Sequence, residues 1–164
     1  MSEPLPITIR QARSEDAPAL IAILYDTFES TWRPQITDAA AAGFRGRDEP
    51  RRYVTERGLD FQVAERGGEV VGLVHWQDDF VHALHVRSDH ARAGVGARLM
   101  DVAEAAMAVA GHAAARLETD TFNARSQAFY AARGYHEAGR YPDETWDSGL
   151  TTLLLVKPLS GPAA

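Results

Sequence analysis

The 164 residues contain no cysteine. The chain therefore has no disulfide bond, no thiolate ligand for a metal and no cysteine nucleophile. It also lacks an apolar run of the roughly 18 to 20 residues that a membrane-spanning helix requires. Residues 1–6 lack the basic region and apolar core of a secretory signal. These absences predict a cytoplasmic protein with no membrane partner.

Positive charge is also in short supply, because 17 Lys and Arg face 23 Asp and Glu, for a net charge of −6. A general nucleic-acid binder is usually basic, since neutralising phosphates dominates its affinity. A local basic patch is one interpretation of four neighbouring arginines, and a solvated helix surface is the other. These arginines are Arg45, Arg47, Arg51 and Arg52. The balance favours the solvated surface and no nucleic-acid partner.

The remaining composition is that of an ordinary globular protein, with 45% hydrophobic and 24% charged residues. The length is enough for one domain with a substantial core and too short for two. The chain has no internal repeat. It therefore predicts a single domain over residues 1–164, with its core at residues 7–157.

Hydrophobic patterns divide the chain into strands and helices. Strands are predicted at residues 7–10, 61–64, 70–74, 80–86, 114–119, 135–141 and 151–157. Helices are predicted at residues 14–28, 94–110 and 123–133, with short helices also possible at 37–44 and 48–57. The helix at 94–110 rests on an apolar stripe of Val95, Leu99, Val102, Ala106 and Val109. The resulting order is β-α-α-β-β-β-α-β-α-β-β.

Only one step in this order has the form of a parallel strand–helix–strand crossover, from residues 80–86 to residues 114–119. The other steps favour hairpins, such as the one that Gly67 and Gly68 predict. The fold class is therefore α/β, of the α+β kind. It has a mixed, mostly antiparallel sheet with helices on both faces.

A glycine loop joins the strand at 80–86 to the helix at 94–110. Gly94 and Gly96 let a ligand approach the backbone, and the first N–H groups of the helix suit a phosphate. Arg92 and Arg98 could add positive charge. The alternative is a plain flexible turn. Because position 99 is Leu99 and no Gly-Lys-Ser/Thr follows, neither a dinucleotide fingerprint nor a P-loop is present.

A second motif occurs in the helix at 123–133 and the two residues after it. Its residues are Asn123, Ser126, Phe129, Tyr130, Gly134 and Tyr135. With the glycine loop, this motif resembles the GNAT superfamily of N-acetyltransferases, whose fold the predicted element order also matches. The chain departs from the family's loop pattern at Ala91, where Gln or Arg is expected.

The resemblance implies a coenzyme site for acetyl-CoA. Backbone amides of the loop would hold the pyrophosphate, the strand would pair with the pantetheine arm, and the second helix would lie along the coenzyme. The residues so assigned are Leu84, His85, Val86, Arg92, Ala93, Gly94, Val95, Gly96, Ala97, Asn123, Ser126 and Phe129.

The resemblance also implies that Tyr130 protonates the departing thiolate, because a tyrosine of pKa about 10 is a protonated donor at neutral pH. Packing on the helix is the alternative role. His82 is the candidate base, since the strand resembles that of the arylalkylamine N-acetyltransferases and a histidine titrates near neutral pH. An exposed strand histidine is the alternative. The reserve bases are Asp78, Asp79 and Glu118.

Strand alternation predicts that His82 and Leu84 share one face and that His85 points to the other. The two histidines then cannot form a metal pair. The remaining histidines show no ligand spacing, so no metal site is predicted.

The family places the acceptor pocket around the first two helices. Phe28 and Trp32 are the predicted substrate-binding residues, although Phe28 also continues the core stripe of its helix. Other candidates are Tyr25, Glu29, Arg33 and Trp146. The prediction is an acetyl-CoA-dependent N-acetyltransferase acting on a primary amine of a small molecule. Acetylation of a protein N-terminus or lysine, a non-catalytic acyl-CoA-binding module and a homodimer remain open.

Overall fold

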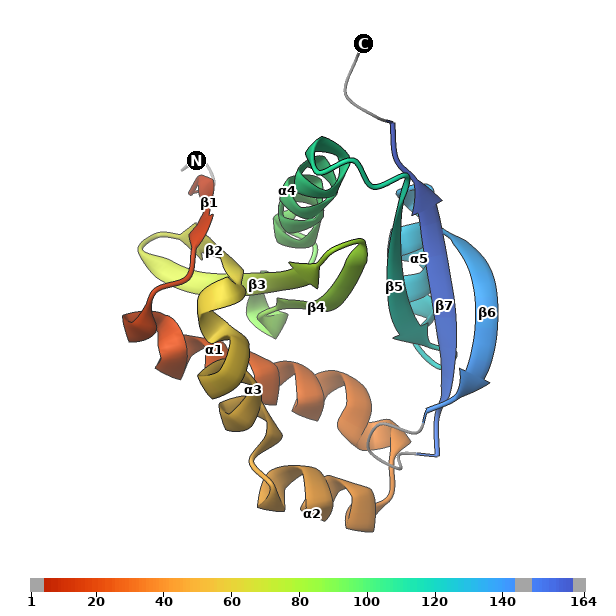
Figure 1. Ribbon diagram of the computed structural model, residues 1–164. Helices are drawn as coiled ribbons and strands as arrows, with labels where there is room; N and C mark the ends of the chain where they lie inside the picture. The colour runs from red at the N-terminus through yellow and green to blue at the C-terminus, as the bar shows by residue number, and fades with distance from the viewer. Residues whose placement is uncertain (1–4, 144–148, 161–164) are drawn as a thin grey trace.

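The computed structural model in Figure 1 describes residues 5–143 and 149–160, so Trp146 lies outside the described residues. The strands are β1 (Ile7–Gln11), β2 (Gln62–Arg66), β3 (Glu69–Gln77), β4 (Phe80–Val86), β5 (Ala114–Asp120), β6 (His136–Pro142) and β7 (Thr151–Pro158). The α-helices are α1 (Ala17–Thr27), α2 (Asp38–Gly46), α3 (Glu49–Arg57), α4 (Val95–Val109) and α5 (Ala124–Ala132). Within these ranges, none of the helices combines the length and apolar character that crossing a bilayer requires.

The strands form a seven-stranded sheet in the order β1-β2-β3-β4-β5-β7-β6. Neighbouring strands are antiparallel except for β4 and β5, which are parallel and joined through α4. The predicted fold class and its single parallel crossover are therefore confirmed.

Three α-helices lie between β1 and β2, where the predicted order counts two. The chain forms both short helices because Thr37 caps α2 by accepting a hydrogen bond from Ala40 N at 3.1 Å. Asp48 then takes a left-handed conformation, with φ of 48°, and Pro50 lies in the first turn of α3. The helix α1 continues as a π-helical turn over Phe28–Trp32.

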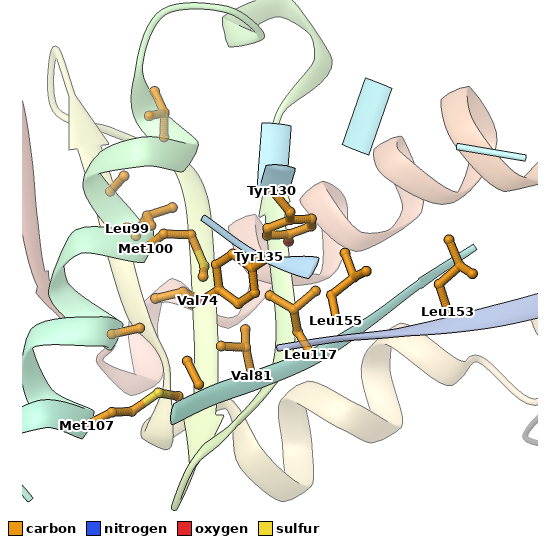
Figure 2. Close-up of a cluster of buried hydrophobic side chains, with 14 of the residues drawn as sticks. Val74, Val81, Leu99, Met100, Met107, Leu117, Tyr130, Tyr135, Leu153 and Leu155 are labelled. Carbon is orange, nitrogen blue, oxygen red and sulfur yellow. The ribbon is translucent and has the colours of Figure 1, made fainter. Parts of the chain in front are cut away.

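Two hydrophobic clusters cover the two faces of the sheet. One cluster joins α1 and α3 to the first strands through Leu20, Val54 and Val63. The other, shown in Figure 2, joins α4 and α5 to the centre of the sheet through Leu99 and Tyr130. Helices therefore lie on both faces, as Figure 1 shows.

The buried face of α4 differs from the predicted stripe. Val95 and Leu99 are buried as expected, but Val109 is 80% exposed. Met100, Ala103 and Met107 complete the buried face instead, because their side chains pack against the sheet together with Leu99. The stripe thus identifies the helix correctly but misplaces the far end of its apolar face.

A β-bulge in β4 changes the direction of His82. The strands β3 and β4 pair His75 with Ala83 and Trp76 with Val81, which leaves His82 as the extra residue. A bulge breaks the alternation of side chains. Leu84 packs in the cluster beneath α4, whereas His82 stacks on His75, which contacts Tyr53 of α3, and His85 contacts Thr27 of α1. The predicted separation of the two histidines onto opposite faces is therefore wrong.

The parallel pair β4–β5 is short. Its register covers only Phe80 with Arg116 and Val81 with Leu117. Beyond Val81 the edge of β4 that faces β5 has no strand partner among the described residues, and the ribbons diverge in Figure 1. This opening positions the site.

Candidate active site

Two cavities meet where β4 and β5 separate. The larger cavity, about 790 Å³, is lined by β4, the start of α4 and α5. The smaller cavity, about 520 Å³, is lined by helices α1 and α3 and by the same two strands. The residues common to both linings are Trp32, His82, Ala83, His85, Glu118, Thr119 and Asp120. Two molecules can therefore reach one shared set of side chains.

The loop before α4 lets a ligand come close to the backbone. Gly94 caps α4 with φ of 84°, in the left-handed region, and no atom lies within 4 Å of where a Cβ would be. The N–H groups of Val95, Gly96 and Ala97 belong to the first turn of α4, so the helix itself offers no carbonyl to accept their hydrogen bonds. All three residues line the larger cavity, so together with the helix dipole they favour an anion there.

Two arginines add positive charge to the larger cavity. Arg92 and Arg125 line it, and both are exposed. Neither has an ion-pair partner within residues 5–143 and 149–160. Ala91 also lines the cavity without offering a side-chain donor. The family motif has no position for Arg125, so the sequence does not predict it.

A side-chain hydrogen bond connects the first turn of α5 to β5 beside this cavity. The Asn123 side chain accepts a hydrogen bond from Ser126 N at 3.0 Å, as an N-cap does. The Ser126 hydroxyl lies 2.9 Å from the Thr119 hydroxyl. A Cβ on Gly96 would lie 3.5 Å from Phe129 Cζ, so α4 and α5 approach closely. Of the predicted coenzyme residues, all except Ala93 line the larger cavity.

Tyr130 is the buried tyrosine of α5, with 8% of its surface exposed. Its ring packs edge-on against Phe129 and Tyr135, at centroid distances of 5.1 Å and 5.5 Å. Its hydroxyl has no hydrogen-bond partner among the described residues, although the residue lines the larger cavity. Burial raises the pKa of Tyr130 above its usual value. The hydroxyl is therefore a protonated donor at neutral pH.

An ionic network around the buried Glu104 holds α5 against α4. The Glu104 carboxylate accepts from the Tyr135 hydroxyl at 2.9 Å and from Lys157 Nζ at 2.5 Å. Arg133 lies 3.2 Å from the same carboxylate and 2.8 Å from Asp101. Because α5 carries Tyr130, this network also fixes where that hydroxyl lies relative to the glycine loop.

Replacing Glu104 with glutamine is expected to lower the free energy of unfolding by about 2 kcal/mol, the range for hydrogen bonds to charged groups. The change keeps the side-chain volume but removes the charge that Arg133 and Lys157 share. Urea denaturation measures the loss.

The control for this substitution is Glu137→Gln, which breaks an exposed pair with Arg140. It should change the unfolding free energy by less than about 0.5 kcal/mol. Equal losses in the two variants would show that the network has no special structural role.

Both histidines at the junction are held neutral. The pKa of His82 is lowered by partial burial and by the nearby Arg57, against the opposing effect of Glu118. Burial lowers the pKa of His85 to about 4, and its Nδ1 lies 2.8 Å from the Thr27 hydroxyl. Within the described ranges, no three His, Asp or Glu side chains are grouped so as to hold a metal ion.

Two carboxylates of β5 complete the junction. Glu118 accepts from the Tyr141 hydroxyl at 2.8 Å. Asp120 accepts from Trp32 Nε1 at 2.7 Å, and its pKa is raised mainly by burial. Residues two apart on a strand share a face, so Asp120 is expected on the same face of β5 as Glu118. No motif in the sequence identifies Asp120 as a site residue.

The other two reserve bases line neither cavity. Asp79 is paired with Arg116, at 2.9 Å and 3.0 Å, and this pair lowers its pKa. Asp78 is a turn residue with φ of 56°. Among the reserves, only Glu118 therefore lies at the junction.

Phe28 and Trp32, the predicted substrate-binding residues, both line the smaller cavity. Phe28 is also core, since it is 2% exposed and stacks on Phe44 with ring centroids 3.9 Å apart. Trp32 comes from the π-helical turn after α1 and also lines the larger cavity.

Three other candidates for the acceptor pocket line neither cavity and instead contact neighbouring side chains. The Tyr25 hydroxyl donates to Asp48 at 2.5 Å, Glu29 pairs with Arg45 at 2.6 Å, and Arg33 pairs with Asp38. The arginines of the suspected basic patch likewise face acidic partners. These contacts are Arg45–Glu29, Arg47–Glu49, Arg51–Asp48 and Arg52–Glu49.

Comparisons with known proteins find acetyltransferases among the relatives of this chain. A protein of Mycobacterium tuberculosis (strain ATCC 25618 / H37Rv) described as "Probable N-acetyltransferase Rv2775" is 27% identical over 180 residues, covering 97% of this chain and 90% of the relative. The blasticidin-S acetyltransferase of Streptomyces morookaense is 39% identical over 103 residues, which cover 60% of this chain and 73% of the relative.

Solved structures share the fold. A GCN5-related N-acetyltransferase from Rhodopseudomonas palustris has a TM-score of 0.78 at 23% identity, covering 97% of this chain and 98% of that one. The PaiA N-acetyltransferase of Thermoplasma acidophilum, solved in complex with coenzyme A, has a TM-score of 0.72 at 18% identity, covering 94% and 99%. The model of the acetyltransferase (GNAT) family matches residues 17–135. This chain therefore belongs to the GNAT acetyltransferase family.

Proposed function

We propose that this protein transfers the acetyl group of acetyl-CoA to a primary amine of a small molecule. The observation that carries the proposal is the junction of the two cavities at the β4–β5 opening. His82 and Glu118 line both cavities there, and Tyr130 lines the larger one. The larger cavity suits the coenzyme and the smaller one suits the amine.

The larger cavity fits coenzyme A at both ends. The free N–H groups of Val95–Ala97 suit the pyrophosphate, with Arg92 and Arg125 beside them. The backbone of Leu84–Val86 lies beyond the last pairing of β4 with β5, so the pantetheine arm can pair with it as an added strand would. When bound, the coenzyme supplies the acetyl group as a reactive thioester.

Replacing Gly94 with alanine is expected to raise the KM for acetyl-CoA about tenfold with little change in kcat. The left-handed conformation costs a residue with a Cβ about 1 kcal/mol or more, so the loop would shift away from the geometry that presents its N–H groups. Steady-state kinetics with varied acetyl-CoA measure the change.

Gly68 provides a matched control, because it has φ of 81° and open space around it in the hairpin between β2 and β3. Gly68→Ala should carry a similar conformational cost but keep the wild-type KM. An unchanged KM in both variants would contradict the role of the loop.

The smaller cavity is acidic, which supports a cationic acceptor. Among the residues that the structure describes, its charged lining consists of five carboxylates and one arginine, namely Glu49, Glu56, Glu118, Asp120, Asp143 and Arg52. A negative wall attracts an alkylammonium ion, and the ring of Trp32 suits an apolar or cationic group. The name of the Streptomyces morookaense relative, blasticidin-S acetyltransferase, supports a small-molecule acceptor.

The residues around the junction can take a proton from the amine and donate one to the departing thiolate. An alkylamine of pKa near 10 arrives charged and must lose a proton before it can attack. His82 is held neutral by its lowered pKa, so it can take that proton directly or through water. Tyr130 stays protonated, so it can donate to the thiolate that departs.

Release of free thiol from acetyl-CoA tests the proposal, with panels of alkylamines, arylalkylamines, amino acids and peptides. We expect the amines without a carboxylate to be the best acceptors, because the acidic cavity repels a negatively charged group on the acceptor. Turnover confined to peptides would overturn the small-molecule assignment. Coenzyme binding without turnover on any panel would overturn the enzymatic one.

A further inference from the structure

His75 is a buried polar residue for which neither the family motif nor the proposed proton transfers provide a role. It lies on β3 and is 4% exposed. The register of β3 with β4 shifts between His75 and Trp76, directly opposite the bulge at His82. A bulge re-aims a side chain but also removes its regular cross-strand neighbour. His82 therefore needs support from another source.

The ring of His75 supplies that support. It stacks on the ring of His82 with centroids 5.1 Å apart and an angle of 29° between the planes. Phe80 contacts the His82 ring as well, at 5.0 Å. One imidazole thus lies against another at the base of the junction, where His82 is itself exposed to the cavities.

His75 is in turn held from α3. The Tyr53 hydroxyl lies 2.5 Å from His75 Nδ1, and the rings of Tyr53 and Phe61 lie 5.6 Å and 5.2 Å from the His75 ring. Burial lowers the pKa of His75 to about 4, with a further lowering from His82. His75 is therefore a neutral, fixed ring throughout the neutral pH range.

We propose that His75, held by Tyr53, is a positioning residue that fixes the ring of His82 toward the junction and shields one of its faces from water. This inference rests on the proposed role of His82. Other charged groups also act on the two histidines. They are Arg57 of α3 and Glu118 of β5, which act on His82, and Asp60 and Arg57, which act on His75. The stack adds desolvation to these charges, and desolvation favours the neutral imidazole.

NMR titration of the His82 imidazole tests this independently of activity. In the wild type the pKa of His82 should lie below 6.5, and in His75→Ala it should rise toward 6.5 because water reaches the exposed face. His75→Phe keeps an aromatic face against His82 and should retain most of the lowering. Tyr53→Phe should fall between the two, since the His75 ring loses its hydrogen bond but not its packing.

Kinetics provide the second readout. In His75→Ala, kcat/KM should fall about tenfold, and the acid limb of its pH profile should move to higher pH together with the pKa of His82. His75→Phe should recover most of this loss. Thr27→Val is the control, because it removes the hydroxyl beside His85 instead and should leave the acid limb in place.

A purely structural role for His75 would lower thermal stability in His75→Ala and leave the His82 titration unchanged, and that result would overturn the inference. If the titration shifts but the acid limb persists in His82→Ala, the positioning stands and the assignment of the base fails. The two conclusions are therefore tested separately.

Discussion

Replacing Tyr130 with phenylalanine is expected to lower kcat about 1,000-fold, within the range for removing a general acid or base. The coenzyme would still bind, since the change deletes only a hydroxyl and leaves the ring packed against Phe129 and Tyr135. The hydroxyl has no partner among the described residues, so the unfolding free energy should hardly change. Single-turnover rates, acetyl-CoA affinity and urea denaturation measure the three effects.

Tyr135→Phe is the matched control. Its hydroxyl donates to the buried Glu104 at 2.9 Å, so its loss should cost about 1 to 2 kcal/mol of stability. We expect kcat to stay nearly intact because Arg133 and Lys157 still hold Glu104 in place. The two tyrosines therefore predict opposite outcomes for the same chemical change. A wild-type kcat in Tyr130→Phe would remove Tyr130 from the acid role.

Replacing His82 with alanine is expected to lower kcat/KM about 100-fold at pH 7 and to remove the acid limb of its pH profile. Because burial and Arg57 lower the pKa of His82, its neutral form predominates at pH 7, and activity should fall only as pH drops below 6.5. The loss is expected to be smaller than for Tyr130 because Glu118 remains at the junction as a second candidate base.

Glu118→Gln separates the two candidate bases. It should leave the acid limb in place, moved slightly downward, because Glu118 raises the pKa of His82. An acid limb that persists in His82→Ala and disappears in Glu118→Gln would assign the base to Glu118.

Two features on the proposed coenzyme side, the glycine before α4 and the cap of α5, could be predicted from sequence because their signals are local. A left-handed glycine before a helix and an Asn that caps the next helix are written in a few consecutive residues, and Gly94 and Asn123 occupy those positions in the structure. Arg125 could not be predicted as a cavity residue, because an exposed cation in the first turn of a helix has no motif of its own.

The acceptor side depends on contacts between distant parts of the chain, which residue type and spacing do not reveal. Trp32 reaches Asp120 across 88 positions, and the junction exists only because β4 and β5 stop pairing after Val81. The bulge at His82 is likewise a property of the register between two strands. Simple alternation within β4 therefore placed His82 and His85 on the wrong faces relative to each other.

The most direct test of the central claim is whether both substrates must be bound together at the junction. Initial rates with varied acetyl-CoA and amine should give intersecting double-reciprocal lines. The intact mass of the protein after incubation with acetyl-CoA alone should be unchanged. Parallel lines and a protein that gains an acetyl group would contradict direct attack by the amine at the cavity junction.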